Sequence, residues 1–249
     1  MSQYDLVIRS GSVIDGTGQQ PFTADVAIKN GKIAATGRVS GHGDREVNAD
    51  GALVTPGFVD IHTHYDGQAT WSNRMSPSSH HGVTSVVMGN CGVGFAPVRP
   101  TDHDLLIELM EGVEDIPGVA LSEGLSWEWE SFPDYLDYLS KRQFDMDICA
   151  QLPHAAMRVY VMGQRGADRE PATTADIIEM RRLTEEAIRA GDTLAWMGMK
   201  MERKRKIMII IMKRIRIVMV LIMVIRSIIT SINIITIVIT TTRITNYII

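Results

Sequence analysis

The sequence predicts an α/β protein in which a small β-sheet region comes before the opening strands of a parallel barrel. Three observations support this class. Residues 4–39 contain short segments in which apolar residues alternate with period two, as in strands that bury one face. Two later runs, 53–61 and 83–88, are apolar without alternation, as in strands buried on both faces. Helix-like and strand-like patterns then alternate over residues 104–190, which favours an α/β architecture.

The N-terminal region is expected to be a small antiparallel sheet. Residues 4–9 and 24–28 have the alternation of strands, and residues 33–36 follow as a third segment. Asn30-Gly31 between the last two predicts a tight hairpin, because both residues readily adopt positive φ.

The buried runs predict strands that end at polar residues. The run 53–61 ends at His62, and the run 83–88 ends at Gly89-Asn90-Cys91-Gly92. Residues 146–152 form a third strand candidate, followed by Pro153-His154.

Three helices are expected between and after these strands. The first spans residues 104–111 with Thr101 or Asp102 as its N-cap, and the second spans residues 132–141 with Ser131 or Pro133 near its start. The third spans residues 175–190, is capped by Thr173 or Thr174 and stops at Gly191.

Charge divides the chain into an acidic body and a basic tail. Residues 1–200 contain 28 acidic and 16 basic side chains, whereas residues 201–249 contain one acidic and nine basic ones. An acidic body argues against nucleic-acid binding, which requires clustered Lys and Arg. Two widely separated cysteines and a polar start without a secretory signal favour a reducing, cytoplasmic setting.

The composition of residues 192–249 differs from that of the body. Ile supplies 18 of residues 201–249, and this stretch has no Gly, Pro or Ala. A unique core needs turn residues and varied side-chain volumes, so we interpret the segment as an aberrant low-complexity tail produced by a frameshift or readthrough. A membrane-associated tail is the alternative, but residues 217–225 are shorter than the ~20 apolar residues of a spanning helix, and Arg226 follows them.

His62-Thr63-His64 is the main candidate for chemistry. Histidines at i and i+2 of an extended segment point to the same side, and imidazole is a common zinc ligand. At the carboxyl end of a barrel strand the two rings would face the region where such folds carry out chemistry. Two solvated loop histidines are the competing interpretation.

Longer motifs make a family resemblance specific. The segments 55–64 (Thr-Pro-Gly-Phe-Val-Asp-Ile-His-Thr-His) and 79–97, with Gly-Asn-Cys-Gly at 89–92, resemble the N-acyl-D-amino-acid deacylase (D-aminoacylase) family of the amidohydrolase superfamily. The resemblance covers roughly residues 4–191. It implies residues 1–54 as the N-terminal part of a small β-sandwich domain and residues 55–191 as the first part of an incomplete (β/α)8 TIM-like barrel.

The same resemblance implies a hydrolase that acts on carbon–nitrogen bonds other than peptide bonds. The implied metal is Zn2+, its implied ligands here are His62, His64 and Cys91, and the substrate would be a small N-acyl-D-amino acid. Asp66 is a candidate to support the ligands, and His154 a candidate to contact substrate. Each of these two could equally be a structural residue.

Some of the implied parts have no counterpart in the sequence. The family's further metal-binding histidines and its general-base aspartate follow later strands, but no histidine follows His154 and only Asp192 and Glu202 are acidic after Gly191. We therefore expect this chain to be impaired or inactive. Two alternatives remain. One is a hydantoinase or dihydropyrimidinase-like cyclic amidohydrolase, in which a carboxylated lysine bridges two metals, and the other is a non-catalytic, membrane-associated fragment.

Overall fold

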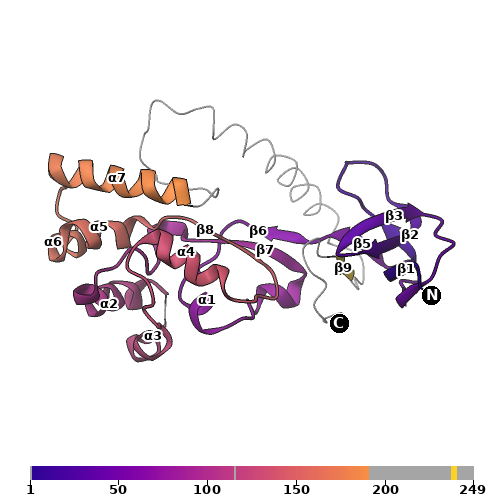
Figure 1. The fold of residues 1–249 in the computed structure, drawn as a ribbon, viewed down its shortest axis with the longest axis horizontal. Coiled ribbons are helices and arrows are strands. Elements are labelled where there is room, and N and C mark those ends of the chain that lie inside the picture. The colour runs from indigo at the N-terminus through magenta and orange to yellow at the C-terminus, as the bar shows by residue number, and fades with distance from the viewer. Residues whose placement is uncertain (1, 115, 191–236, 240–249) are drawn as a thin grey trace. The chain divides into compact units, whose positions relative to one another are not determined.

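The computed structural model describes residues 2–114, 116–190 and 237–239 (Figure 1). These residues form two compact units. The first contains residues 2–59, 81–84 and 237–239, and the second contains the described residues of 60–80 and 85–190. The expected domain limits at residues 54 and 191 stay predictions.

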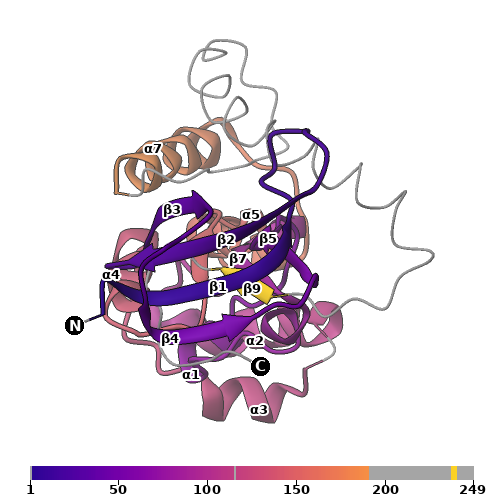
Figure 2. The same ribbon diagram turned by 90° about the vertical axis from the view of Figure 1, so that its right-hand side faces the viewer.

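The first unit is built on a mixed sheet with the strand order β3-β2-β1-β5-β9, in which β4 also pairs with β1 (Figure 2). Its strands are β1 (Tyr4–Val13), β2 (Phe22–Lys29), β3 (Lys32–Gly37), β4 (Gly43–Asn48), β5 (Leu53–Pro56) and β9 (Ile237–Ile239). Apolar residues of β1, β2 and β5 form its core, including Ile8, Ile28 and Val54.

The antiparallel sheet expected for residues 4–39 and its hairpin are both present, and the later strands β4 and β5 add parallel pairs that make the whole sheet mixed. Asn30 and Gly31 turn the chain between β2 and β3 with φ of 52° and 69°. β1 runs antiparallel to β2 but parallel to β4 and β5. The mostly polar sequence of β4 has no apolar alternation. Instead it is held to β1 partly by polar contacts, since the guanidinium of Arg9 donates to the Glu46 carboxylate.

The run 53–61, expected to be one strand, forms two strands that belong to different sheets. β5 ends at Pro56, and β6 (Phe58–Asp60) starts after Gly57. Pro56 has no N–H to donate to a ladder, and a Cβ on Gly57 would collide with the side chain of Thr84. This close approach requires glycine at the point where the chain leaves the first sheet.

The second sheet has the order β6-β7-β8. β7 (Val83–Met88) and β8 (Asp147–Ala150) are parallel, with Val87 opposite Cys149. Both strands lie within the segments that the sequence predicts. These strands alternate along the chain with helices, which confirms the α/β class, while their place in an eight-stranded barrel stays a prediction.

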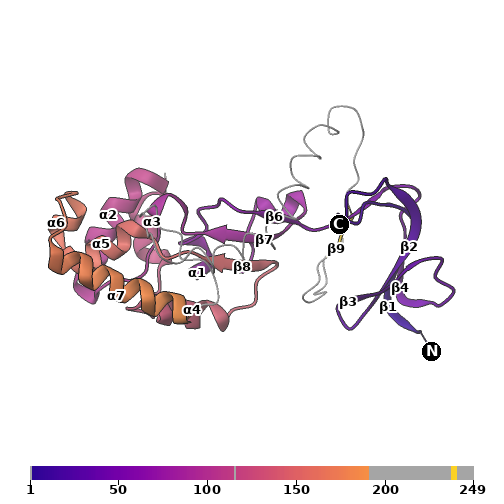
Figure 3. The same cartoon turned by 90° about the horizontal axis from the view of Figure 1, so that it is seen from above.

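Helices make up most of the rest of this unit. They are α1 (Gln68–Trp71), α2 (His103–Glu114), α3 (Gly118–Gly124), α4 (Phe132–Ser140), α5 (His154–Met162), α6 (Gln164–Ala167) and α7 (Thr174–Ala190). The three predicted helices correspond to α2, α4 and α7. Ser131 caps α4 through a reciprocal pair of bonds with Asp134, and α7 packs against α4 and α5 (Figure 3).

The expected low-complexity tail, residues 192–249, lies outside the described residues except for the three residues of β9. Within the described ranges, no helix combines the length and the apolar character needed to cross a membrane.

Candidate metal centre

The His62-Thr63-His64 segment follows β6 and is fixed by its middle residue. Thr63 is buried, and both its backbone N–H and its hydroxyl donate to the Val87 carbonyl at the end of β7, over 3.0 and 2.9 Å. Neighbouring side chains of an extended segment point to opposite sides. Anchoring Thr63 against β7 therefore directs both imidazoles away from the sheet edge, to one common side.

Cys91 reaches the same place from the loop after β7. It lies in a short 3-10 turn, η2 (Asn90–Gly92), and its own backbone is left-handed, with φ of 56°. Gly89 and Gly92 on either side have φ of 84° and 76°. The three left-handed residues bend the chain sharply and bring the thiol back over the histidine segment.

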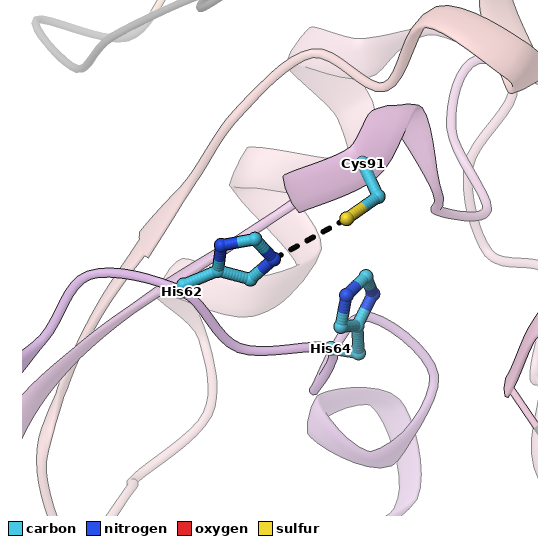
Figure 4. A group of neighbouring side chains, drawn as sticks. All are labelled: His62, His64 and Cys91. Atoms are coloured by element: carbon cyan, nitrogen blue, oxygen red, sulfur yellow. Dashed lines mark hydrogen bonds between the residues drawn. The ribbon is translucent and has the colours of Figure 1, made fainter.

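The three side chains form one cluster of potential ligands. Their nitrogen and sulfur atoms all lie within 4.8 Å of one another, and His62 Nε2 is 3.2 Å from Cys91 Sγ. Figure 4 shows the two rings and the thiol directed toward a common point. The ring centroids of His62 and His64 are 5.6 Å apart, so the rings are adjacent without being stacked.

The donor set fits a zinc ion. Zinc takes nitrogen ligands at about 2.0–2.1 Å and thiolate at about 2.3 Å in a tetrahedral arrangement, which places neighbouring donor atoms roughly 3.3–3.6 Å apart. In this cluster the donor atoms His62 Nε2 and Cys91 Sγ are separated by 3.2 Å, and all donor atoms lie within 4.8 Å of one another. These distances lie around the range for zinc, so small rotations of the side chains would complete the geometry. Three protein ligands would leave a fourth position open, as is usual in catalytic zinc sites.

The local environment of His64 suits a ligand. Burial lowers the pKa of its imidazole, and the neighbouring His62 lowers that pKa further. Both effects favour the neutral ring, whose free nitrogen lone pair can bind a metal.

Cys149 does not belong to this cluster. It is half-buried on β8, and burial raises the pKa of its thiol. A protonated thiol is a poor ligand, which agrees with its interpretation as a packed residue.

Asp66 and His154 also lie outside the three-residue cluster. Asp66 is buried, its carboxylate faces Gly94, and its backbone carbonyl accepts a hydrogen bond from Tyr135. His154 is the first residue of α5, and its backbone and Cβ lie against Gly92. Their suggested roles toward ligands and substrate stay predictions.

Asn90 and Gln151 are polar residues at this site that sequence reasoning did not single out. Both are buried, and they hydrogen-bond to each other and to the backbone beside the ligands. Asn90 stood inside the Gly-Asn-Cys-Gly motif, but nothing in its spacing showed that its amide would bridge two loops.

The fold and this cluster define an α/β protein that brings two histidines and a cysteine together, as candidate metal ligands, at the ends of neighbouring strands. Residues 45–195 match the Amidohydrolase family, and the chain belongs to that family.

Proteins of known activity are similar to the same part of the chain. It is 33% identical over 189 residues to the D-aminoacylase of Alcaligenes xylosoxydans xylosoxydans, which covers 76% of this chain and 36% of that protein. It also matches a crystal structure of D-aminoacylase with a TM-score of 0.62 and 33% identity, over 76% of this chain and 37% of that one.

A second solved structure contains zinc. N-acyl-D-glutamate deacylase from Bordetella bronchiseptica, in complex with zinc and a phosphonate inhibitor, matches with a TM-score of 0.56 and 28% identity. That match covers 75% of this chain and 36% of the deacylase. The chain thus spans little more than a third of the length of these relatives.

Proposed function

We propose that this chain carries part of the zinc site of an enzyme that hydrolyses the amide bond of N-acyl-D-amino acids. The observation that carries the proposal is the His62, His64 and Cys91 cluster, in which two imidazoles and a thiol converge within 4.8 Å. The similarity to D-aminoacylase and to a zinc-containing N-acyl-D-glutamate deacylase supports both the metal and the substrate class.

In this proposal the chain's own residues hold and orient the reacting groups. His62 and His64 supply neutral nitrogens, and Cys91 supplies a thiolate. When bound, zinc would contribute Lewis-acid polarisation of the amide carbonyl. His154, at the start of α5 and next to Gly92, would contact a substrate held near Cys91, and its nearness to Gly92 supports this role. Partial desolvation and the positive charge of Arg158 lower the pKa of His154, so its ring is neutral at pH 7 and offers both a donor and an acceptor.

We expect this chain to bind the metal but to hydrolyse its substrate slowly or not at all. Hydrolysis also needs a general base, and the ligand cluster found among the described residues contains no carboxylate. The cyclic-amide alternative is less well supported, because residues 60–190 contain a single lysine, Lys141, and it is exposed at the end of α4.

Metal titration of the full 249-residue chain tests the proposed site. Metal-free protein titrated with Zn2+ in a calorimeter should bind, and Cys91→Ser or His64→Ala should weaken binding by at least about tenfold. Cys149→Ser is the matched control and should leave the affinity unchanged. An unmodified chain that does not bind Zn2+, or a Cys149→Ser loss equal to that of Cys91→Ser, would contradict the proposal.

An assay of the substrate class accompanies the titration. N-acetyl-D-amino acids, their L enantiomers and a hydantoin are offered to the zinc-loaded chain. We expect slow hydrolysis or none, and any hydrolysis should be restricted to the D enantiomers and stop when the metal is removed. Hydrolysis of the hydantoin in preference to the D-amino-acid derivatives would instead support the cyclic-amide alternative.

A further inference from the structure

A buried side-chain amide joins the two segments that supply the ligands. Asn90, directly before Cys91, donates through Nδ2 to the carbonyl of Val87 at 2.8 Å and to the carbonyl of Thr63 at 3.3 Å. Thr63 lies between His62 and His64. The side-chain amide of Asn90 therefore links the residue next to Cys91 to the backbone between the two histidines.

A second amide fixes the orientation of the first. Gln151, just after β8, donates through Nε2 to Asn90 Oδ1 at 3.1 Å, and its own N–H donates to the carbonyl of Met88. Asn90 is 8% and Gln151 6% exposed, so water cannot easily replace these bonds. Two carbonyl oxygens facing Nδ2 and a donor facing Oδ1 leave only one orientation of the Asn90 amide with every contact satisfied.

The backbone of Cys91 needs such external support. A left-handed conformation costs an L-residue free energy and persists only where its surroundings enforce it. Glycines at 89 and 92 permit the sharp bend without fixing it. The side chain of Asn90 ties the start of this turn to β7 and to the histidine segment.

We propose that Asn90, oriented by Gln151, is the positioning residue that sets the spacing between Cys91 and the histidine pair and thereby the affinity of the site for a metal ion. The inference rests on the proposed function, because it assumes that His62, His64 and Cys91 bind metal. Asn90 touches no ligand atom in this role and acts through the two backbone segments that it holds together.

Cobalt binding separates positioning from general stability. Co2+ replaces Zn2+ in comparable sites, and its charge-transfer absorption with a thiolate reports whether Cys91 and the histidines hold the same ion. The full metal-free chain is titrated with Co2+ alone, and the affinity and this absorption band are recorded. Far-ultraviolet circular dichroism of each variant establishes that its secondary structure is retained.

The decisive variants remove the bridge and its support separately. Asn90→Leu preserves the approximate volume but removes both donated bonds, and it should weaken Co2+ binding by about 10- to 100-fold and reduce the thiolate band. Gln151→Leu removes only the bond that orients Asn90, so a loss of about two- to tenfold is expected. Asn73→Leu, at an exposed asparagine of the same unit that bonds Arg142, is the matched control and should bind like the unmodified chain.

The outcomes distinguish the inference from the proposed function. An unmodified chain without a cobalt–thiolate band would overturn the proposed function itself. A normal band in the unmodified chain, with Asn90→Leu folded and equal to Asn73→Leu in affinity and band intensity, would overturn the inference alone. If Asn90→Leu does not fold, Gln151→Leu decides, and an affinity equal to that of the unmodified chain would refute the positioning role.

Discussion

At the scale of single residues, the candidate site depends on a backbone turn that few side chains would allow. Gly89, Cys91 and Gly92 are left-handed, and the turn begins where β7 ends. A Cβ on Gly89 would overlap the backbone carbonyl of Gln151, which cannot move aside as a flexible side chain could. Both the positive φ and this close approach require glycine at position 89.

Replacing Gly89 with alanine should therefore destabilise the protein. The left-handed backbone and the collision with Gln151 together should cost about 2–4 kcal/mol in the free energy of unfolding. Gly112→Ala is the matched control, since position 112 lies within α2 and an added Cβ meets nothing within 4 Å. It should stabilise the protein by about 0.5–1 kcal/mol. Urea unfolding of both variants measures the difference, and equal effects would contradict this account.

At the scale of elements, α7 shows how local polar residues start a helix and tie it to its neighbour. Asp176 accepts hydrogen bonds from the N–H and hydroxyl of Thr173, whose oxygen accepts in return from the Asp176 N–H. Arg165 of α6 binds the same carboxylate at 2.9 Å and also contacts Glu170. The Arg165 guanidinium and the Thr173 donors lower the pKa of Asp176 from 3.8 to about 2.

This depressed pKa predicts an acid-dependent contribution to stability. A carboxyl group with a lower pKa in the folded state stabilises the protein fully above its unfolded value of 3.8, and this stabilisation is lost as the pH falls through about 2. Asp176→Asn should lower the thermal midpoint at pH 6, and its difference from the unmodified chain should shrink below pH 4.

The control for this prediction lies on the same helix. Glu185→Gln removes exposed pairs with Arg181 and Arg189, which contribute little, and should change the midpoint only slightly at either pH. A difference between Asp176→Asn and the unmodified chain that stays constant from pH 6 to pH 3 would show that Asp176 does not act through its charge.

At the scale of the whole molecule, the candidate ligands and the described tryptophans belong to the same unit. His62, His64 and Cys91 lie in the second unit, as do Trp71, Trp127 and Trp129. The remaining tryptophan, Trp196, lies outside the described residues. The first unit has no tryptophan, so tryptophan fluorescence reports mainly on the unfolding of the unit that carries the site.

Zinc should therefore stabilise the folded state of the second unit, and tryptophan fluorescence should detect this as a shift of the unfolding midpoint. A ligand that binds only the folded state adds about 2.7 kcal/mol when its free concentration is a hundred times its dissociation constant. Zn2+ at that excess should raise the urea midpoint of the fluorescence transition, and a chelator should reverse the shift. Cys91→Ser at the same zinc concentration should show a much smaller shift. An equal shift in that variant would place the bound zinc elsewhere.

The sequence by itself determined much of the local structure and the identity of the candidate ligands. Period-two alternation predicted β1 and β2, Asn30-Gly31 predicted the hairpin between β2 and β3, and capping residues predicted α4 and α7. These features depend on neighbours close in the chain, and sequence patterns record such neighbours directly. The histidine pair and Cys91 were recognised because they stand in a family motif.

Only the tertiary structure decided which distant segments meet. The break at Gly57 depends on Thr84 of β7, and the pairing of β4 with β1 depends partly on the contacts of Arg9 with Glu46. The bridge from Asn90 to Thr63 joins residues 27 positions apart. Polar contacts and close backbone approaches of this kind leave no periodic pattern in the sequence, because each depends on a single partner that folding brings near.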